Sequence, residues 1–271
     1  MIVALVTSLS YLLLVLLTPA AVLGLTYINR STKRLLGDVW GIKAEIYVGG
    51  VGIVIHEFSH MIVALLFGHR IDSFNLLVMP WEHKCQPPSE KGALGFVNHS
   101  WNSNSLYQSI GNAFIGTAPI IGCSLALSGL TRVFNPGLNE GYKTVTTNLS
   151  EQASLVGVLN LLPTMFRHVS LPSGFWGICG LILWALLSLG ISVGGFDLSP
   201  ADLKSTRLAL VEIYLILAVV FFSLCYMGMS QTVNCYLLKA IAWFISLIFL
   251  SFIWSITANL AVKLVVKIMY Y

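Results

Sequence analysis

Six apolar stretches, each long enough to cross a lipid bilayer, dominate the sequence. A membrane-spanning helix needs about 20 mostly apolar residues. Such stretches lie at 2–28, 45–68, 108–131, 174–194, 205–229 and 236–262. Only 10% of the residues are charged, against about 25% in a typical soluble domain. The sequence therefore predicts an all-α polytopic membrane protein with six transmembrane helices.

Basic residues gather just after the first apolar stretch, at Arg30, Lys33, Arg34 and Lys43. Cytoplasmic loops of membrane proteins carry an excess of Lys and Arg, so this segment is expected to face the cytoplasm. The N-terminus is then expected outside, with the multi-pass chain in the cell membrane. The first stretch does not begin with basic residues, so we expect it to be retained as a helix and not removed as a signal peptide.

The segment 72–101 does not have a helical pattern, because prolines such as Pro80 and the glycine Gly92 interrupt it. Its flanks, 73–79 and 93–97, are short and strand-like. The sequence predicts a small β-hairpin or loop region here, lying against the membrane body.

Two further segments are not expected to cross the bilayer. The segment 132–150 contains an Asn-Pro-Gly run at 135–137 and a polar, Thr-rich tail, and is predicted to be a loop. The segment 153–166 is apolar but short, which favours a half-helix or a re-entrant segment. We see no separate soluble domain, so residues 1–271 are expected to form a single membrane-embedded domain.

One apolar stretch, 45–68, carries three polar residues in an HExxH pattern: His56, Glu57 and His60. Histidines four residues apart share one face of a helix, so both imidazoles can reach one zinc ion. Glu57 can take a proton from a zinc-bound water and later give it to a leaving amine. A charge near the bilayer centre costs at least ~2.5 kcal/mol, so we predict a catalytic site with one Zn²⁺ per chain. A structural polar cluster or a proton relay is the alternative.

From His56 the chain reads HEFSHMIVALLFGHRIDSFNL. This resembles the site-2 protease family of intramembrane metalloproteases, in which a small residue, a glycine and spaced apolar residues follow the HExxH motif. The matching positions here are Ala64, Gly68, Ile71, Phe74 and Leu76. The resemblance implies a zinc protease that hydrolyses peptide bonds within or near transmembrane segments.

Catalytic zinc takes three protein ligands and keeps one position open. In the site-2 family the third ligand is an Asp within an Asn-Pro…Leu-Asp-Gly motif, which this chain lacks. We expect Asp202 in this role, with Asp197 as the alternative third ligand and Glu212 as a further candidate. Ser199, Pro200 and Asp202 also fit the N-cap, N1 and N3 positions of a helix, a role that is compatible with metal binding.

A helical substrate must unwind locally before it is cut, and a strand edge can hold the extended form. The segments 73–79 and 93–97 are candidates, although they could simply pack over the membrane body. Asn112 or Asn160 could orient a substrate carbonyl, but the small residues around Asn112 also suit close helix packing. Other possible ligands are the histidines His69, His83, His99 and His168. Each is expected at an interface or in a loop, which favours an ordinary solvated side chain.

Together these features predict a zinc metalloendopeptidase that acts on membrane-protein or membrane-peptide substrates in the lipid bilayer. Two alternatives stay open: a membrane zinc hydrolase of the CAAX-protease type, which usually takes a Glu as third ligand, and a non-enzymatic metal or proton transporter. The net charge of +4 without a long basic run does not suggest nucleic acid as a partner. The sequence leaves the oligomeric state open.

Overall fold

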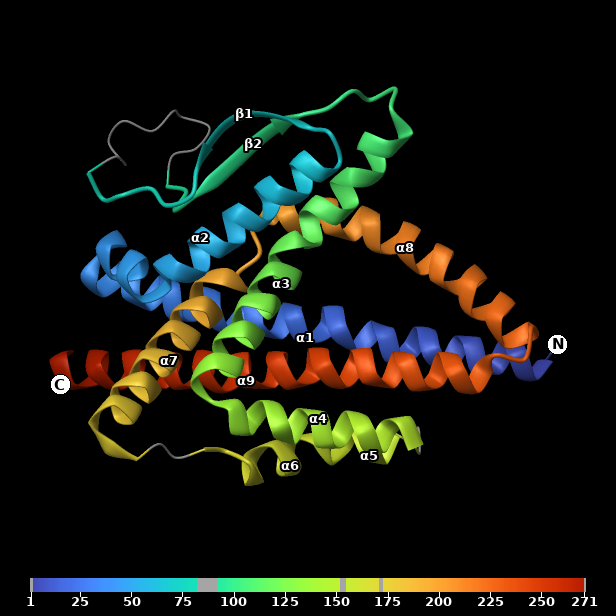
Figure 1. Cartoon of the computed structure of the whole chain (residues 1–271). Coiled ribbons are helices and arrows are strands. Elements are labelled where there is room, and N and C mark those ends of the chain that lie inside the picture. Colours follow the sequence, from blue (N-terminus) through green and yellow to red (C-terminus); the bar gives the residue numbers. More distant parts are fainter. Residues whose placement is uncertain (1, 82–91, 152–154, 171–172, 271) are drawn as a thin grey trace. The chain divides into compact units, whose positions relative to one another are not determined.

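The computed structural model describes residues 2–81, 92–151, 155–170 and 173–270 of the chain. Helices account for most of these residues, and two short strands pair beside them (Figure 1). The elements are α1 (Ile2–Trp40), α2 (Ile42–Leu66), β1 (Arg70–Asn75), β2 (Phe96–Ser100), α3 (Leu106–Phe134), α4 (Pro136–Glu151), α5 (Leu155–Leu159), α6 (Leu161–Arg167), α7 (Gly174–Gly195), α8 (Pro200–Tyr226) and α9 (Ser230–Tyr270). An all-α fold with a small β-hairpin is thus confirmed.

Four helical segments within the described residues are long and apolar enough to cross a bilayer: Ile42–Leu66, Phe114–Phe134, Gly174–Gly195 and Ser230–Met269. They support an integral membrane protein with several spans. The other two predicted spans, 2–28 and 205–229, lie in α1 and α8. The described residues there hold shorter apolar segments, Ala4–Leu13 and Tyr214–Tyr226. The count of six spans is therefore not confirmed, and the outside position of the N-terminus stays a prediction.

The segment 132–150 is mostly helix α4, so the prediction of a loop was wrong. Pro136 occupies the first helical position, where its missing N–H has no cost and its fixed φ suits a helix. Leu138 and Val145 are buried, and Tyr142 packs beside Val145 in the same apolar cluster. The three side chains follow helical spacing, so tertiary packing on one face stabilises a segment whose polar residues suggested a turn.

The segment 153–166, predicted as a half-helix or re-entrant element, contains most of two short helices, α5 and α6. Its residues 153 and 154 lie outside the described residues. Both contact α4. Val158 and Leu161 pack against Val145 of α4 and against Leu238 and Ile241 of α9. A helix of so few residues is only marginally stable in isolation, so the packing in this cluster stabilises α5 and α6.

The chain divides into two compact units. One comprises Met1–Val22, Ser128–Ala185 and Leu210–Leu250, and the other comprises Leu23–Leu127, Leu186–Ala209 and Ser251–Tyr271. The second unit contains the HExxH helix, the hairpin and the start of α8, and we call it the site unit. That residues 1–271 act as a single domain stays a prediction.

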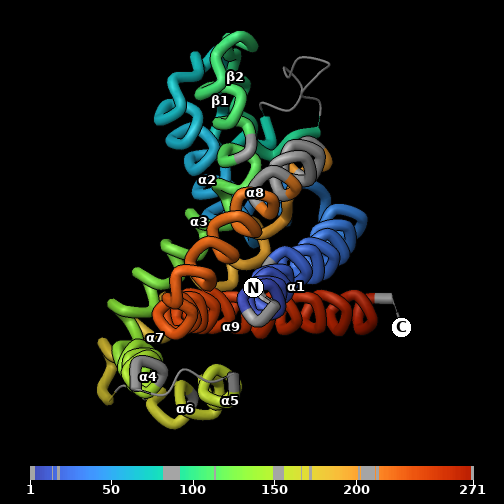
Figure 2. Tube along the Cα trace, turned by 90° about the vertical axis from the view of Figure 1, so that its right-hand side faces the viewer, coloured from blue at the N-terminus to red at the C-terminus, as the bar shows by residue number. Residues whose placement is uncertain are grey.

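The hairpin of the site unit lies alongside α2 in both Figure 1 and Figure 2. Its strands β1 and β2 are antiparallel, from Arg70 opposite Ser100 to Asn75 opposite Phe96. A backbone hydrogen bond from Val78 N–H to the Leu94 carbonyl, 2.8 Å long, extends the pairing. The predicted hairpin is confirmed, although β1 begins three residues before its expected start and β2 three residues after its expected start.

Glycines allow α2 and α7 to touch through their backbones. A Cβ atom on Gly52 would clash with the backbone nitrogen of Gly195 and would lie 2.5 Å from the Gly190 oxygen. One on Gly49 would lie 3.1 Å from the Gly194 Cα atom. Small residues commonly permit such close helix contacts in membranes. This contact brings the carbonyl end of α7 next to the HExxH face of α2.

We predict that Gly52→Ala lowers the unfolding midpoint of the detergent-solubilised protein, because the methyl group must push α2 from α7. The expected cost is about 1–3 kcal/mol, typical of overpacking. The matched control is Gly129→Ala in α3, where an added Cβ meets nothing within 4 Å. It should leave the thermal midpoint unchanged or slightly raised. Equal midpoints for the two variants would contradict the close α2–α7 contact.

Candidate metal centre

His56 and His60 project from one face of α2, and both side chains are buried. Nδ1 of His56 lies 2.9 Å from the Gly195 carbonyl oxygen, and Nδ1 of His60 lies 2.8 Å from the Ile115 carbonyl oxygen. A carbonyl can only accept a hydrogen bond, so each Nδ1 is the donor. In the neutral rings this leaves a lone pair on each Nε2. Histidines that bind metals are commonly held in this way by a backbone carbonyl.

Asp202 reaches the same place from the start of α8. The Ser199 N–H donates to Asp202 Oδ2 at 2.8 Å, and the Asp202 N–H donates to Ser199 Oγ at 3.1 Å. This reciprocal pair confirms the predicted N-cap and N3 positions. The same carboxylate lies 3.4 Å from His56 Nε2 through Oδ2 and 3.2 Å from His60 Nε2 through Oδ1. Capping therefore holds the carboxylate toward the two histidines.

The three groups have the spacing of a metal site. The Nε2 atoms of His56 and His60 are 3.1 Å apart, and one ligand atom from each of the three residues lies within 4.8 Å of the others. Ligands on a tetrahedral zinc, at about 2.0–2.1 Å from the ion, are about 3.3 Å from each other. Two lone pairs and a carboxylate converge here, and their mutual repulsion is relieved by a cation or by a proton on one imidazole. The donor set, two imidazoles and a carboxylate, fits zinc.

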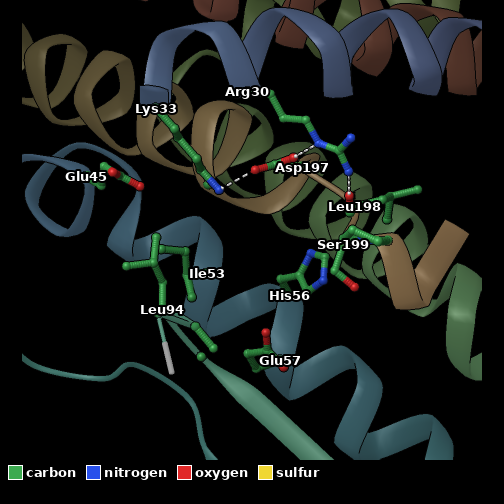
Figure 3. A pocket seen from close by; sticks show the side chains of 15 residues that line it. Arg30, Lys33, Glu45, Ile53, His56, Glu57, Leu94, Asp197, Leu198 and Ser199 are labelled. Carbon is green, nitrogen blue, oxygen red and sulfur yellow. Dashed lines mark hydrogen bonds and ion pairs between the residues drawn. The ribbon is translucent and has the colours of Figure 1, made fainter. Parts of the chain in front are cut away.

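Asp197, the alternative third ligand, is not brought to the histidines. Its carboxylate pairs with Arg30 Nε at 3.2 Å and with Lys33 Nζ at 2.9 Å (Figure 3). Arg30 also donates from Nη2 to the Leu198 carbonyl at 2.5 Å. Arg30 and Lys33, two of the four basic residues behind the expected cytoplasmic segment, thus bind the loop before α8. The side chain of Glu212 and the whole of His83 lie outside the described residues.

One face of α1 holds the chain segment 192–198, an arrangement that sequence reasoning missed. Thr26 Oγ1 donates to the Phe196 carbonyl at 3.1 Å, and Asn29 Nδ2 donates to the Ser192 carbonyl at 2.7 Å. With Arg30 and Lys33 these residues follow the i, i+3, i+4, i+7 spacing of a helix face. Polar residues at that spacing within α1 were the available signal. The segment they hold leads directly to the helix that bears the carboxylate.

Glu57 faces two cavities of the site unit. The smaller, of about 420 Å³, is drawn in Figure 3, where the Glu57 carboxylate points toward His56. The larger, of about 550 Å³, is also lined by His60 and Asp202. Residues that line both are Glu57, Ala93, Gly95 and Ser199. A Cβ atom on Gly95 would lie 2.7 Å from Glu57 Cγ, so the chain leading into β2 passes directly over the glutamate.

The two candidate asparagines and two of the other histidines lie in different surroundings. Asn112 lines the larger cavity, whereas Asn160 is exposed and lies in the other unit. The expectation of a solvated His69 was wrong, because this side chain is buried against His99 and the Gln108 carbonyl. His168 is exposed, as expected.

Comparisons with protein-family models, curated proteins and solved structures found no match. Two imidazole lone pairs and a carboxylate could hold a metal ion, and the neighbouring glutamate at the cavity could exchange a proton with water there.

We predict that Asp202→Ala weakens zinc binding by more than about 100-fold, because it removes a ligand, with the affinity measured by zinc titration against a competing chelator. Asp197→Ala should keep about one zinc per chain and lose about 10-fold at most, since Asp197 only holds the loop. The exposed His168→Ala serves as the control. Loss of zinc from Asp197→Ala with retention in Asp202→Ala would reverse the assignment.

Proposed function

We propose that this chain is a membrane-embedded zinc metalloendopeptidase that hydrolyses peptide bonds within or near transmembrane segments of membrane-protein substrates. The observation that carries the proposal is the convergence of His56, His60 and Asp202 beside Glu57 at a cavity. The resemblance of residues 56–76 to the site-2 protease family supports it. The family's Asn-Pro…Leu-Asp-Gly motif is absent, and the capping carboxylate of α8 offers the third ligand in its place.

His56, His60 and Asp202 would hold the zinc ion. The bound ion would supply a Lewis acid that activates water and polarises a peptide carbonyl. Glu57 follows His56 directly in α2 and faces both cavities, so its carboxylate can accept a proton from the attacking water and deliver it to the leaving amine. Held by two carbonyls and a helix cap, the ligand set is organised before substrate arrives.

The hairpin offers a place for an extended substrate. Among the described residues the sheet has two strands in the order β1–β2, so β2 is at an edge. Gly95, Phe96, Val97 and Asn98 line the larger cavity together with Glu57. A peptide that adds to a strand edge is held by main-chain hydrogen bonds in an extended form, which exposes its carbonyls to attack.

The rival functions have less support. A hydrolase of the CAAX-protease type would use a Glu such as Glu212, but Asp202 already lies beside both histidines. A metal or proton transporter could use the same cluster, yet it would not need a glutamate that faces a cavity large enough for a peptide segment.

We predict that Glu57→Gln abolishes proteolysis and retains zinc, since it removes the general base but no ligand. Wild-type and variant protein would be reconstituted in liposomes with a membrane-protein extract, and new N-termini counted by mass spectrometry. The expected loss is at least about 10²-fold, the usual contribution of general acid–base catalysis.

The matched control is Glu140→Gln on α4, an exposed glutamate paired with Lys143. It should cleave like the wild type. Equal sets of new termini from wild type and Glu57→Gln would refute the protease. Zinc or proton flux that is independent of Glu57 would favour the transporter.

A further inference from the structure

His69, His99 and Trp101 form a cluster of three rings at the larger cavity, which we call the ring cluster. The ring centroids of His69 and His99 are 4.9 Å apart, and Trp101 stacks on His69 at 5.8 Å with an interplanar angle of 19°. His69 is 3% exposed. His99 and Trp101 both line the cavity that contains Glu57. None of the three rings has a part in the chemistry proposed above.

The ring cluster is positioned by the end of α2. Gly68 has φ +71°, the left-handed conformation that favours glycine. Its N–H donates to the Leu65 carbonyl at 3.0 Å, and the His69 N–H donates to the Ala64 carbonyl at 2.9 Å. These two bonds make a Schellman motif, which fixes the residue after Gly68 relative to the helix. His69 is therefore placed by the same helix that carries His56 and His60.

The hydrogen bonds of His69 determine which nitrogen of His99 is available. His69 Nε2 lies 2.8 Å from the Gln108 carbonyl oxygen, which can only accept, so Nε2 is the donor. In a neutral ring His69 Nδ1 is then an acceptor, and the His99 Nδ1–H, 2.9 Å away, donates to it. A neutral His99 thus has its lone pair on Nε2.

The neutral form of His99 is favoured by its surroundings. Burial lowers the pKa of His99 from its ordinary value, and positive charge on His69 or His60 would lower it further, while Asp72 opposes the shift. At neutral pH the ring therefore offers a hydrogen-bond acceptor at Nε2 and a donor to His69 at Nδ1.

We propose that His99 is a substrate-binding residue whose Nε2 accepts a hydrogen bond from a backbone N–H of the extended peptide in the larger cavity, with His69 as its positioning residue. The inference rests on the proposed protease function and identifies a contact for its peptide substrate. Its basis is the place of His99 on β2, on the cavity shared with Glu57, His60 and Asp202. The direction of the His99–His69–Gln108 hydrogen bonds supports it.

A matched pair of substitutions separates this role from a structural one. In His99→Gln the amide oxygen can take the place of Nε2, but the contact with His69 is lost. In His99→Asn the shorter amide can still donate to His69, but nothing reaches the Nε2 position. Each variant would be assayed for the rate of new N-termini from the same membrane-protein extract, for zinc per chain and for the unfolding midpoint.

We expect the cleavage rate of His99→Gln to stay within about 3-fold of the wild-type rate. The rate of His99→Asn should fall about 10-fold, which is the usual effect of losing one substrate hydrogen bond. Zinc content should be unchanged in both. The inference is overturned if His99→Asn cleaves like the wild type, if His99→Gln is the more impaired of the two, or if activity is lost only together with zinc.

Failure of the proposed function is recognised separately, because the Glu57→Gln comparison is made with His99 intact. If wild-type protein cleaves and Glu57→Gln does not, the protease stands, and the two His99 variants alone decide the role of the ring.

Discussion

The hydrogen bond from His56 to the Gly195 carbonyl joins the two helices on which the candidate site depends. It forms because glycines on α2 and α7 allow backbone contact, which brings the last carbonyl of α7 within 2.9 Å of Nδ1. The bond selects the tautomer of His56 and turns its Nε2 toward His60 and Asp202. A small-residue helix contact, ordinary in membrane proteins, thus orients a candidate metal ligand.

The two aspartates near the start of α8 have different roles for an electrostatic reason. A buried carboxylate needs hydrogen-bond donors or positive charge. Asp197 obtains both from Arg30 and Lys33 and so ties the loop to α1. Asp202 accepts a hydrogen bond from the Ser199 N–H at the helix start, and its carboxylate lies 3.4 and 3.2 Å from the Nε2 atoms of His56 and His60, where a bound cation would supply the positive charge. The structural carboxylate and the candidate ligand are thus only five positions apart in the chain.

Local chemistry predicted some parts of the fold well and others poorly. The capping box at Ser199 could be predicted from the sequence, because it depends on two residues only three positions apart. Helix α4 could not be predicted in this way, because its stability comes from Val145 and Tyr142 packing on distant residues such as Leu238 rather than from its own polar sequence. The burial of His69 was missed for the same reason, since Trp101 and Gln108, which cover it, follow it by more than 30 residues.

The sequence by itself determined the membrane character, the HExxH face of α2 and a small set of acidic residues that could be the third metal ligand. These features follow from span length, residue spacing and helix-start chemistry, which are local properties. Only the tertiary structure decided that Asp202 lies with His56 and His60 while Asp197 pairs with α1. It also placed the ring cluster at the cavity of Glu57. These outcomes depend on contacts between residues about 30 to 170 positions apart. The path of the folded chain decides such contacts, and the spacing of residues in the sequence does not.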